Sequence, residues 1–247
     1  MILCVASSLT AGIIYSEDFS TGTGGWACNG GTIDASSGAL TVTPSANYKT
    51  IYGPSQDAMM GDLQIGEKLI ISMDIKRGAD WTGTSRISLY AMAPSYYTYS
   101  MSTQMAGSDQ KYMIGRTPSP SSAPSVWSDN YLNSGAAAAV STTEFETYSF
   151  SIQRLAANQL GFEIRRDGTL MGSATETYDD VDEPAANLML DFSRIWIGWG
   201  FNNSGDLGGS FQIDNVQAEL VVPEPATLTL FGSTILGLLV FRRKHLG

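Results

Sequence analysis

The sequence predicts an all-β protein, an antiparallel β-sandwich followed by a single C-terminal transmembrane helix. Along the body, apolar residues recur at every second position, which is the period of a half-buried strand. Gly, Ser and Thr are abundant between these runs, and no long amphipathic helical pattern interrupts them. Near the C-terminus, residues 226–241 form one uncharged apolar run. We therefore expect one β-sandwich domain at residues 13–221, with residues 222–247 as a separate tail.

Residues 1–12 resemble the remnant of a signal peptide. The stretch from Ile2 to Ile14 is mostly apolar or small, and Thr10, Ala11 and Gly12 suit a cleavage site. No Lys or Arg precedes it, so either the true start lies upstream or the signal is noncanonical, and we favour the first. Export to an oxidising compartment is expected, yet Cys28 would be the only cysteine in the domain and has no intramolecular partner.

Strands are expected wherever the alternation is clear. The clearest runs are residues 69–75, 148–152 and 160–164, and further candidates are 14–19, 40–43, 49–52, 86–92, 195–201 and 211–222. Asp167-Gly168 between two such runs predicts a hairpin turn, because glycine accepts positive φ at no steric cost. Two intervals, 94–134 and 171–187, read as long connections.

Three short motifs resemble the concanavalin-like and carbohydrate-binding-module jelly rolls. They are Tyr15-Ser16-Glu17-Asp18-Phe19, Gly38-Ala39-Leu40-Thr41-Val42 and Phe211-Gln212-Ile213-Asp214-Asn215-Val216. The resemblance implies that the first and last strands lie close together. It also implies a structural Ca²⁺ between them, with Glu17, Asp18 and Asp214 as ligands. The alternative is that Asp214 makes a hydrogen bond at a strand edge and Glu17 is solvated.

Composition excludes several kinds of chemistry. The tail holds three of the 14 basic and one of the 24 acidic residues, so the preceding segment carries a net charge of −12. This charge argues against nucleic acid and against electrostatic binding to anionic lipid. The single histidine, His245, lies beyond the apolar run, which removes histidine-based triads and zinc sites from the domain. No carboxylate string typical of glycosidases occurs, Glu144-Phe145-Glu146 being the nearest pair, so we expect no catalytic residues.

Sugar binding commonly uses aromatic faces, and several aromatic residues fall in or beside expected loops. The candidates for a stacking platform are Trp81, Tyr96, Tyr97, Tyr99, Trp127 and Tyr131. By contrast, Trp196 and Trp199 lie on opposite faces of an expected strand, so at least one of them should pack in the core. For any single aromatic residue, packing in the core or anchoring a loop is the alternative.

The tail has three ordered parts. Val222, Pro223, Glu224 and Pro225 precede the apolar run, and Arg242, Arg243 and Lys244 follow it. Sixteen helical residues span about 24 Å, short of a bilayer core of roughly 30 Å, but the basic residues can snorkel and follow the positive-inside rule. A transmembrane helix is therefore favoured over a buried amphipathic one.

This arrangement resembles the PEP-CTERM sorting signal of Gram-negative bacteria, which exosortase recognises and cuts nearby; an ordinary C-terminal anchor is the alternative. The resemblance implies export, a transient stay in the inner membrane, and a final place at the cell surface or in the extracellular matrix. A noncatalytic domain that interacts with extracellular polysaccharide is the leading functional hypothesis. The alternatives are a purely structural envelope component and, less favoured, a glycoside hydrolase or lyase.

Overall fold

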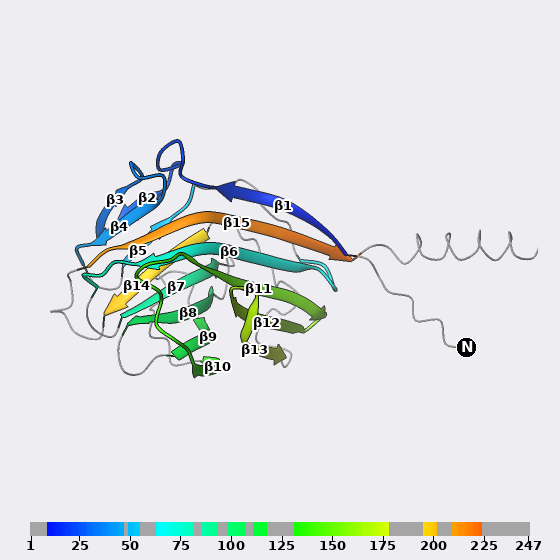
Figure 1. Ribbon diagram of the computed structural model, residues 1–247. Helices are drawn as coiled ribbons and strands as arrows, with labels where there is room; N and C mark the ends of the chain where they lie inside the picture. Colours follow the sequence, from blue (N-terminus) through cyan, green and yellow to red (C-terminus); the bar gives the residue numbers. More distant parts are fainter. Residues whose placement is uncertain are drawn as a thin grey trace, which may run out of the picture.

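The computed structural model describes residues 9–46, 49–54, 63–81, 85–92, 98–106, 111–117, 131–177, 195–201 and 209–223 (Figure 1). Within these ranges the chain forms strands β1 to β15 and no helix. The strands form two antiparallel sheets, so the predicted β-sandwich is confirmed. No helix in the described ranges is long and apolar enough to cross a bilayer, and the predicted span at 226–241 lies outside them.

The larger sheet, called sheet A, has eight strands. Its order is β13 (Thr169–Thr177), β12 (Gln159–Arg166), β11 (Glu146–Ala156), β6 (Lys68–Arg77), β15 (Phe211–Pro223), β4 (Leu40–Pro44) and β3 (Gly31–Asp34), and β1 (Leu9–Glu17) pairs with β15. Sheet B has seven strands. Its order is β10 (Tyr131–Ala136), β9 (Lys111–Thr117), β8 (Thr98–Ala106), β7 (Ser85–Met92), β14 (Ile195–Phe201), β5 (Lys49–Tyr52) and β2 (Ala27–Asn29).

The hydrophobic core lies between the two sheets. In β6 the buried residues are Leu69, Ile71, Met73 and Ile75, which is the alternation that the sequence predicts. Phe150 of β11 and Phe162 of β12 stack at 6.3 Å between ring centroids. Burying each such side chain contributes roughly 1.5–3 kcal/mol, so each inward position of the alternation adds to the driving force for folding.

The first and last strands lie side by side, as the jelly-roll resemblance implied. β1 pairs with the C-terminal half of β15, from Glu17 opposite Val216 to Leu9 opposite Pro223. The sheet therefore extends beyond both predicted domain boundaries. Residues 9–12, assigned to a signal remnant, form strand here, and so do Val222 and Pro223, because the backbone ladder continues where the side-chain pattern ends.

The hairpin at Asp167-Gly168 is confirmed. It joins β12 to β13, and both turn residues have positive φ, 49° and 76°, as a type I′ turn requires. The two long connections, however, are wrong in part. β8, β9 and the start of β10 fall inside the first interval, and β13 covers residues 171–177 of the second. These segments are mostly polar, and their place in a sheet comes from backbone pairing with neighbouring strands.

Candidate functional site

The structure describes three of the six residues predicted for the aromatic platform, Trp81, Tyr99 and Tyr131. Trp81 is 2 % exposed and packs edge-to-face on Phe211 at 5.6 Å between ring centroids, so it is a core residue and its assignment as a ligand contact is wrong. Tyr99 pairs with Ala91, which pairs with the buried Ile195, so position 99 belongs to the row that faces the core. Tyr96, Tyr97 and Trp127 lie outside the described residues.

Tyr131 is aligned through Gly115 with Ser100, and so lies in a different row of the sheet from Tyr99. A single row of paired positions crosses sheet B and contains four aromatic residues. It runs Tyr52, Trp196, Tyr90, Ser100, Gly115 and Tyr131 over β5, β14, β7, β8, β9 and β10. Ile51 and Ile197, the neighbours of two row members along their strands, are fully buried. Since successive strand residues alternate between faces, the backbone register places positions 52 and 196 on the outer face of sheet B, opposite the buried Ile51 and Ile197.

The spacing of this aromatic row follows from the sheet itself. Neighbouring strands lie about 4.8 Å apart, so positions 52 and 90 are separated by roughly 10 Å, and position 131 lies roughly 14 Å farther on. Ser100 and Gly115 leave the middle of the row without a bulky residue. The sequence alone missed Tyr52, Tyr90 and Trp196, because each sits in a strand of its own and only the register aligns them. The one signal in the sequence is the alternation Ile195-Trp196-Ile197, which places the tryptophan on the face opposite its two apolar neighbours.

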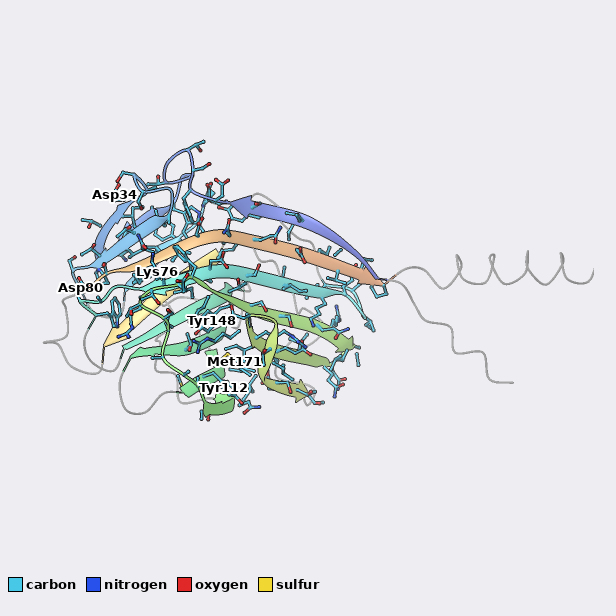
Figure 2. All side chains as sticks on the ribbon, viewed as in Figure 1. Asp34, Lys76, Asp80, Tyr112, Tyr148 and Met171 are labelled. Carbon is cyan, nitrogen blue, oxygen red and sulfur yellow. The ribbon has the colours of Figure 1, made fainter. Side chains whose placement is uncertain are left out.

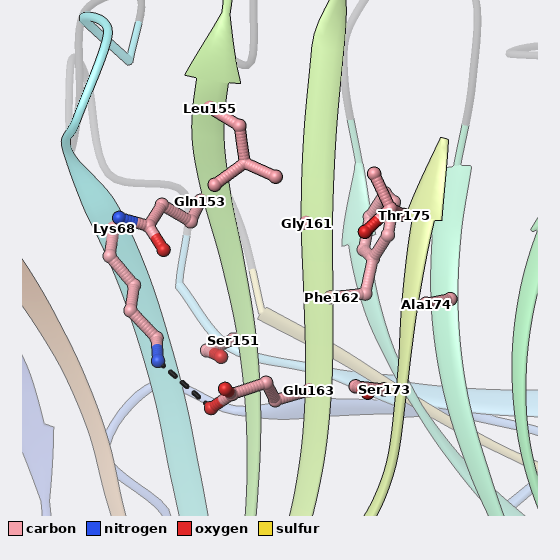
Figure 3. A pocket seen from close by; sticks show the side chains of 10 residues that line it. All are labelled: Lys68, Ser151, Gln153, Leu155, Gly161, Phe162, Glu163, Ser173, Ala174 and Thr175. Carbon is pink, nitrogen blue, oxygen red and sulfur yellow. Dashed lines mark hydrogen bonds and ion pairs between the residues drawn. The ribbon is translucent and has the colours of Figure 1, made fainter. Parts of the chain in front are cut away.

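Sheet A carries a second candidate, a polar depression of about 160 Å³ on its outer face (Figure 3). Glu163 lies at its edge and accepts hydrogen bonds from Lys68 Nζ at 3.0 Å and from Arg165 at 3.3 Å. The hydrogen bond from Lys68 lowers the pKa of Glu163 below its ordinary value. Gly161 leaves the floor bare, and Leu155 forms an apolar rim. The charges are paired, and Phe162, the aromatic residue among the lining residues, is only 1 % exposed, so the depression offers hydroxyl and amide contacts but little stacking surface.

The predicted calcium ligands lie near one another but do not form a ligand set. Glu17 accepts the Phe19 N–H at 2.8 Å, Asp18 accepts the Ser20 N–H at 3.0 Å, and Asp214 accepts the Asn215 N–H at 2.8 Å. Within the described part of the chain, no three carboxylate, thiol or imidazole groups converge as metal ligands do. Calcium binding therefore stays a prediction.

Asp214 nevertheless sits in an unfavourable electrostatic environment. Burial raises its pKa above the ordinary value, and the negative charges of Asp74 and Asp18 raise it further. Asp74 lies directly opposite Asp214 in the ladder between β6 and β15. The side-chain amide of Asn215 donates to Asp74 at 2.8 Å and relieves part of this repulsion.

The first half of the predicted sorting motif belongs to the folded domain. Val222 and Pro223 are the last two residues of β15 and pair with Thr10 and Leu9. Glu224 and Pro225, and the basic residues Arg242, Arg243 and Lys244, lie outside the described residues. A Cβ added to Gly66 would lie 2.9 Å from Pro223 Cγ, so the turn that contains Gly66 packs closely against the end of β15.

The fold is a two-sheet antiparallel β-sandwich, and the solved structures that resemble it are jelly-roll folds. The chain is similar to an endo-1,3-β-glucanase from Streptomyces sioyaensis, with 15 % identity, a TM-score of 0.58, and 86 % of this chain and 97 % of that chain covered. It is also similar to the carbohydrate recognition domain of Emp47p, with 13 % identity, a TM-score of 0.53, and 83 % and 94 % covered. A third structure comes from work on endo-acting O-glycanases of the human gut microbiota, with 12 % identity, a TM-score of 0.51, and 86 % and 100 % covered. At these identities the likeness shows the fold alone.

The tail is more specific. Residues 221–244 match the family described as the PEP-CTERM protein-sorting motif. The chain therefore carries a PEP-CTERM sorting signal, which implies processing by exosortase, export, and sorting through the membrane. No curated protein sequence matches the chain.

Proposed function

We propose that this is an exosortase-sorted surface or matrix protein whose sandwich binds extracellular polysaccharide on the outer face of sheet B, without cleaving it. The observation that carries the proposal is the aromatic row, in which Tyr52, Trp196 and Tyr90 are directly paired and Tyr131 lies farther along. Aromatic rings stack on the apolar faces of sugars, and several in line suit an extended chain. The acidic character of the domain favours a neutral glycan over a polyanionic one.

Changing Trp196 to alanine is expected to weaken glycan binding at least about tenfold, or roughly 1.4 kcal/mol, because central aromatic contacts dominate such interfaces. Binding would be measured on a glycan array and then by calorimetry with the best glycan. Phe145→Ala is the matched control, since Phe145 is exposed on another part of the molecule and lies under the Lys76 ammonium group at 4.6 Å.

Other outcomes of this experiment would refute the binding surface or indicate a different function. Equal losses for Trp196→Ala and Phe145→Ala would refute the row as the binding surface. Absence of binding to any glycan, with recovery of the protein in insoluble surface polymer, would favour a purely structural role. Release of new reducing ends from a bound polysaccharide would show that the protein is a glycosidase, and its breakdown into unsaturated fragments would show a lyase.

Calcium belongs to the proposal as a structural ion held by Glu17, Asp18 and Asp214. A bound cation would offset the repulsion that raises the pKa of Asp214. The same cation would bridge the first and last strands at the point where Glu17 faces Val216. Its removal would then weaken the junction between β1 and β15.

Without calcium, Asp214→Asn is expected to raise the melting temperature at pH 7. Asp214 binds its proton more tightly in the folded state, so its ionised form destabilises the fold at neutral pH. This cost disappears as the pH falls through the raised pKa, and the two proteins should then melt together. Thermal melts at pH 7 and in acid, in the presence of a chelator, provide the measurement.

Calcium reverses this difference if the site exists. It should stabilise the wild type but not Asp214→Asn, since an ion that binds only the folded state raises its stability. The control is Asp34→Asn, because hydrogen bonds from Ser36 lower the pKa of Asp34 and its loss should not stabilise the fold. Identical melts of the wild type with calcium and with chelator would end the calcium proposal.

A further inference from the structure

The end of the sandwich from which the chain leaves carries an unusual turn. Gln64, Ile65, Gly66 and Glu67 form a β-turn closed by the Glu67 N–H donating to the Gln64 carbonyl at 2.9 Å, and Gly66 has a φ of +94°. Ile65 occupies the corner of this turn and is 60 % exposed. Turn corners are normally polar or occupied by proline, so a large exposed apolar side chain at the tip suggests a surface that contacts another molecule.

Two more exposed apolar residues lie beside this turn. The Gly66 N–H donates to the Arg154 carbonyl at 2.7 Å, which brings Leu155, 41 % exposed, next to the turn. Pro223 packs against Gly66, and the preceding Val222 is 37 % exposed. Ile65, Leu155 and Val222 together are called the exit patch. Figure 1 shows that β1 begins and β15 ends at this end of the sandwich.

The position of the sorting signal along the chain indicates which surface lies against the exit patch. Val221 is paired on both sides, with Ala11 of β1 and with Lys68 of β6, so the strand is held firmly almost to its end. Only Glu224 and Pro225 separate Pro223 from the uncharged run that starts at residue 226. Three residue steps separate Pro223 from residue 226 and span at most about 11 Å, so the exit patch cannot be far from the surface that receives this run.

We propose that, before processing, the sandwich stands end-on at the membrane and inserts the exit patch into the outer part of the lipid bilayer. This proposal rests on the membrane stage of the proposed function. Apolar side chains of surface-bound proteins enter the headgroup boundary to a depth of roughly 5–10 Å, which Ile65 at the tip of a turn can reach. The contact is apolar, in keeping with a net negative domain that anionic headgroups do not attract.

The orientation has a consequence for the glycan surface. The aromatic row crosses sheet B near the end of β5 and the start of β14, whereas the exit patch lies at the ends of strands of sheet A, where β15 terminates. The two surfaces belong to different sheets, so lipid contact at the exit patch does not use the residues of the row.

Site-specific fluorescence on the full chain tests the proposal. Ile65→Cys and Ala79→Cys, made in a Cys4→Ser, Cys28→Ser background, would each carry an environment-sensitive dye. Ala79 is exposed and adjoins Asp80, which lies at the opposite end of the sandwich (Figure 2). The proteins would be reconstituted into phosphatidylethanolamine–phosphatidylglycerol vesicles whose acyl chains carry a quencher. We expect the dye at position 65 to lose most of its fluorescence and the dye at position 79 to lose none.

The controls separate this proposal from the one on which it rests. If the chain sediments with the vesicles but the dye at position 65 is not quenched, the exit-patch proposal is wrong and the membrane stage stands. If the chain stays in the supernatant, both are wrong. If quenching at position 65 appears only when exosortase is present in the vesicles, the exit patch does not enter the bilayer by itself and the proposal is wrong.

Discussion

Replacing Trp81 with alanine should lower the free energy of unfolding by about 3–5 kcal/mol, the usual cost of truncating a buried aromatic residue. Trp81 is 2 % exposed and lies edge-to-face on Phe211. Its carbonyl accepts a hydrogen bond from Arg77 at 3.3 Å, and a Cβ added to Gly209 would lie only 2.7 Å from its Cα. The surrounding backbone is thus closely packed and cannot collapse into the cavity. Urea denaturation followed by circular dichroism provides the measurement.

Trp81→Phe is the control for this prediction, because it keeps an aromatic ring in the core and should lose much less stability. The role that the sequence suggested for Trp81 makes an opposite prediction. A Trp81→Ala protein that unfolds at the wild-type urea concentration but no longer binds glycan would show that Trp81 is a ligand contact after all. A loss of stability shared by both variants would instead indicate that the indole itself is required.

Glu146→Ala is expected to destabilise the fold by about 2–4 kcal/mol, because it breaks a mostly buried charged network. Glu146 forms an ion pair with Arg166, and the two side chains are only 14 % and 19 % exposed. Glu146 also accepts the Ser141 N–H at 3.1 Å and a hydrogen bond from the Tyr148 hydroxyl at 3.4 Å. One substitution therefore leaves several buried donors without this acceptor.

Glu144→Ala is the matched control, since Glu144 is exposed and stands two residues away on the same segment. It should change stability by no more than about 0.5 kcal/mol. A double-mutant cycle with Arg166→Ala then isolates the ion pair, and a coupling energy near zero would contradict the prediction. Arg166 keeps hydrogen bonds to the carbonyls of Ala138 and Ala139, so the single Glu146 variant should still fold.

The contrast between Glu144 and Glu146 also shows which features of a side chain cannot be predicted from the sequence. The sequence gives no reason to distinguish these two carboxylates, which stand two residues apart at the start of a strand. In the structure, Glu146 is mostly buried against Arg166, twenty positions away, whereas Glu144 is exposed. Their difference depends on how β12 lies beside β11, where Tyr148 faces Arg166 in the register. Trp81 is a second example. It lies beside an expected loop in the sequence, but in the structure it packs in the core against Phe211 of the last strand.

The same reasoning explains the missed strands and the missed site. β8 and β9 lack a clear apolar alternation, and their backbone pairing with β7 and with each other makes them strands. The aromatic row needs five such pairings to align, and a shift of one residue in any of them would move a member to the other face. No local pattern carries that information.

By itself, the sequence determined the sandwich class, the clearest strands, the turn at Asp167-Gly168 and the sorting signal, because each depends on local periodicity, local backbone preference or a contiguous motif. The tertiary structure alone decided which aromatic residues share a face, which carboxylates are buried, and that the sorting motif begins inside the last strand beside an apolar turn. Those features depend on strand register and on contacts between distant segments. The free energy that selects them comes from the packed sheets as a whole.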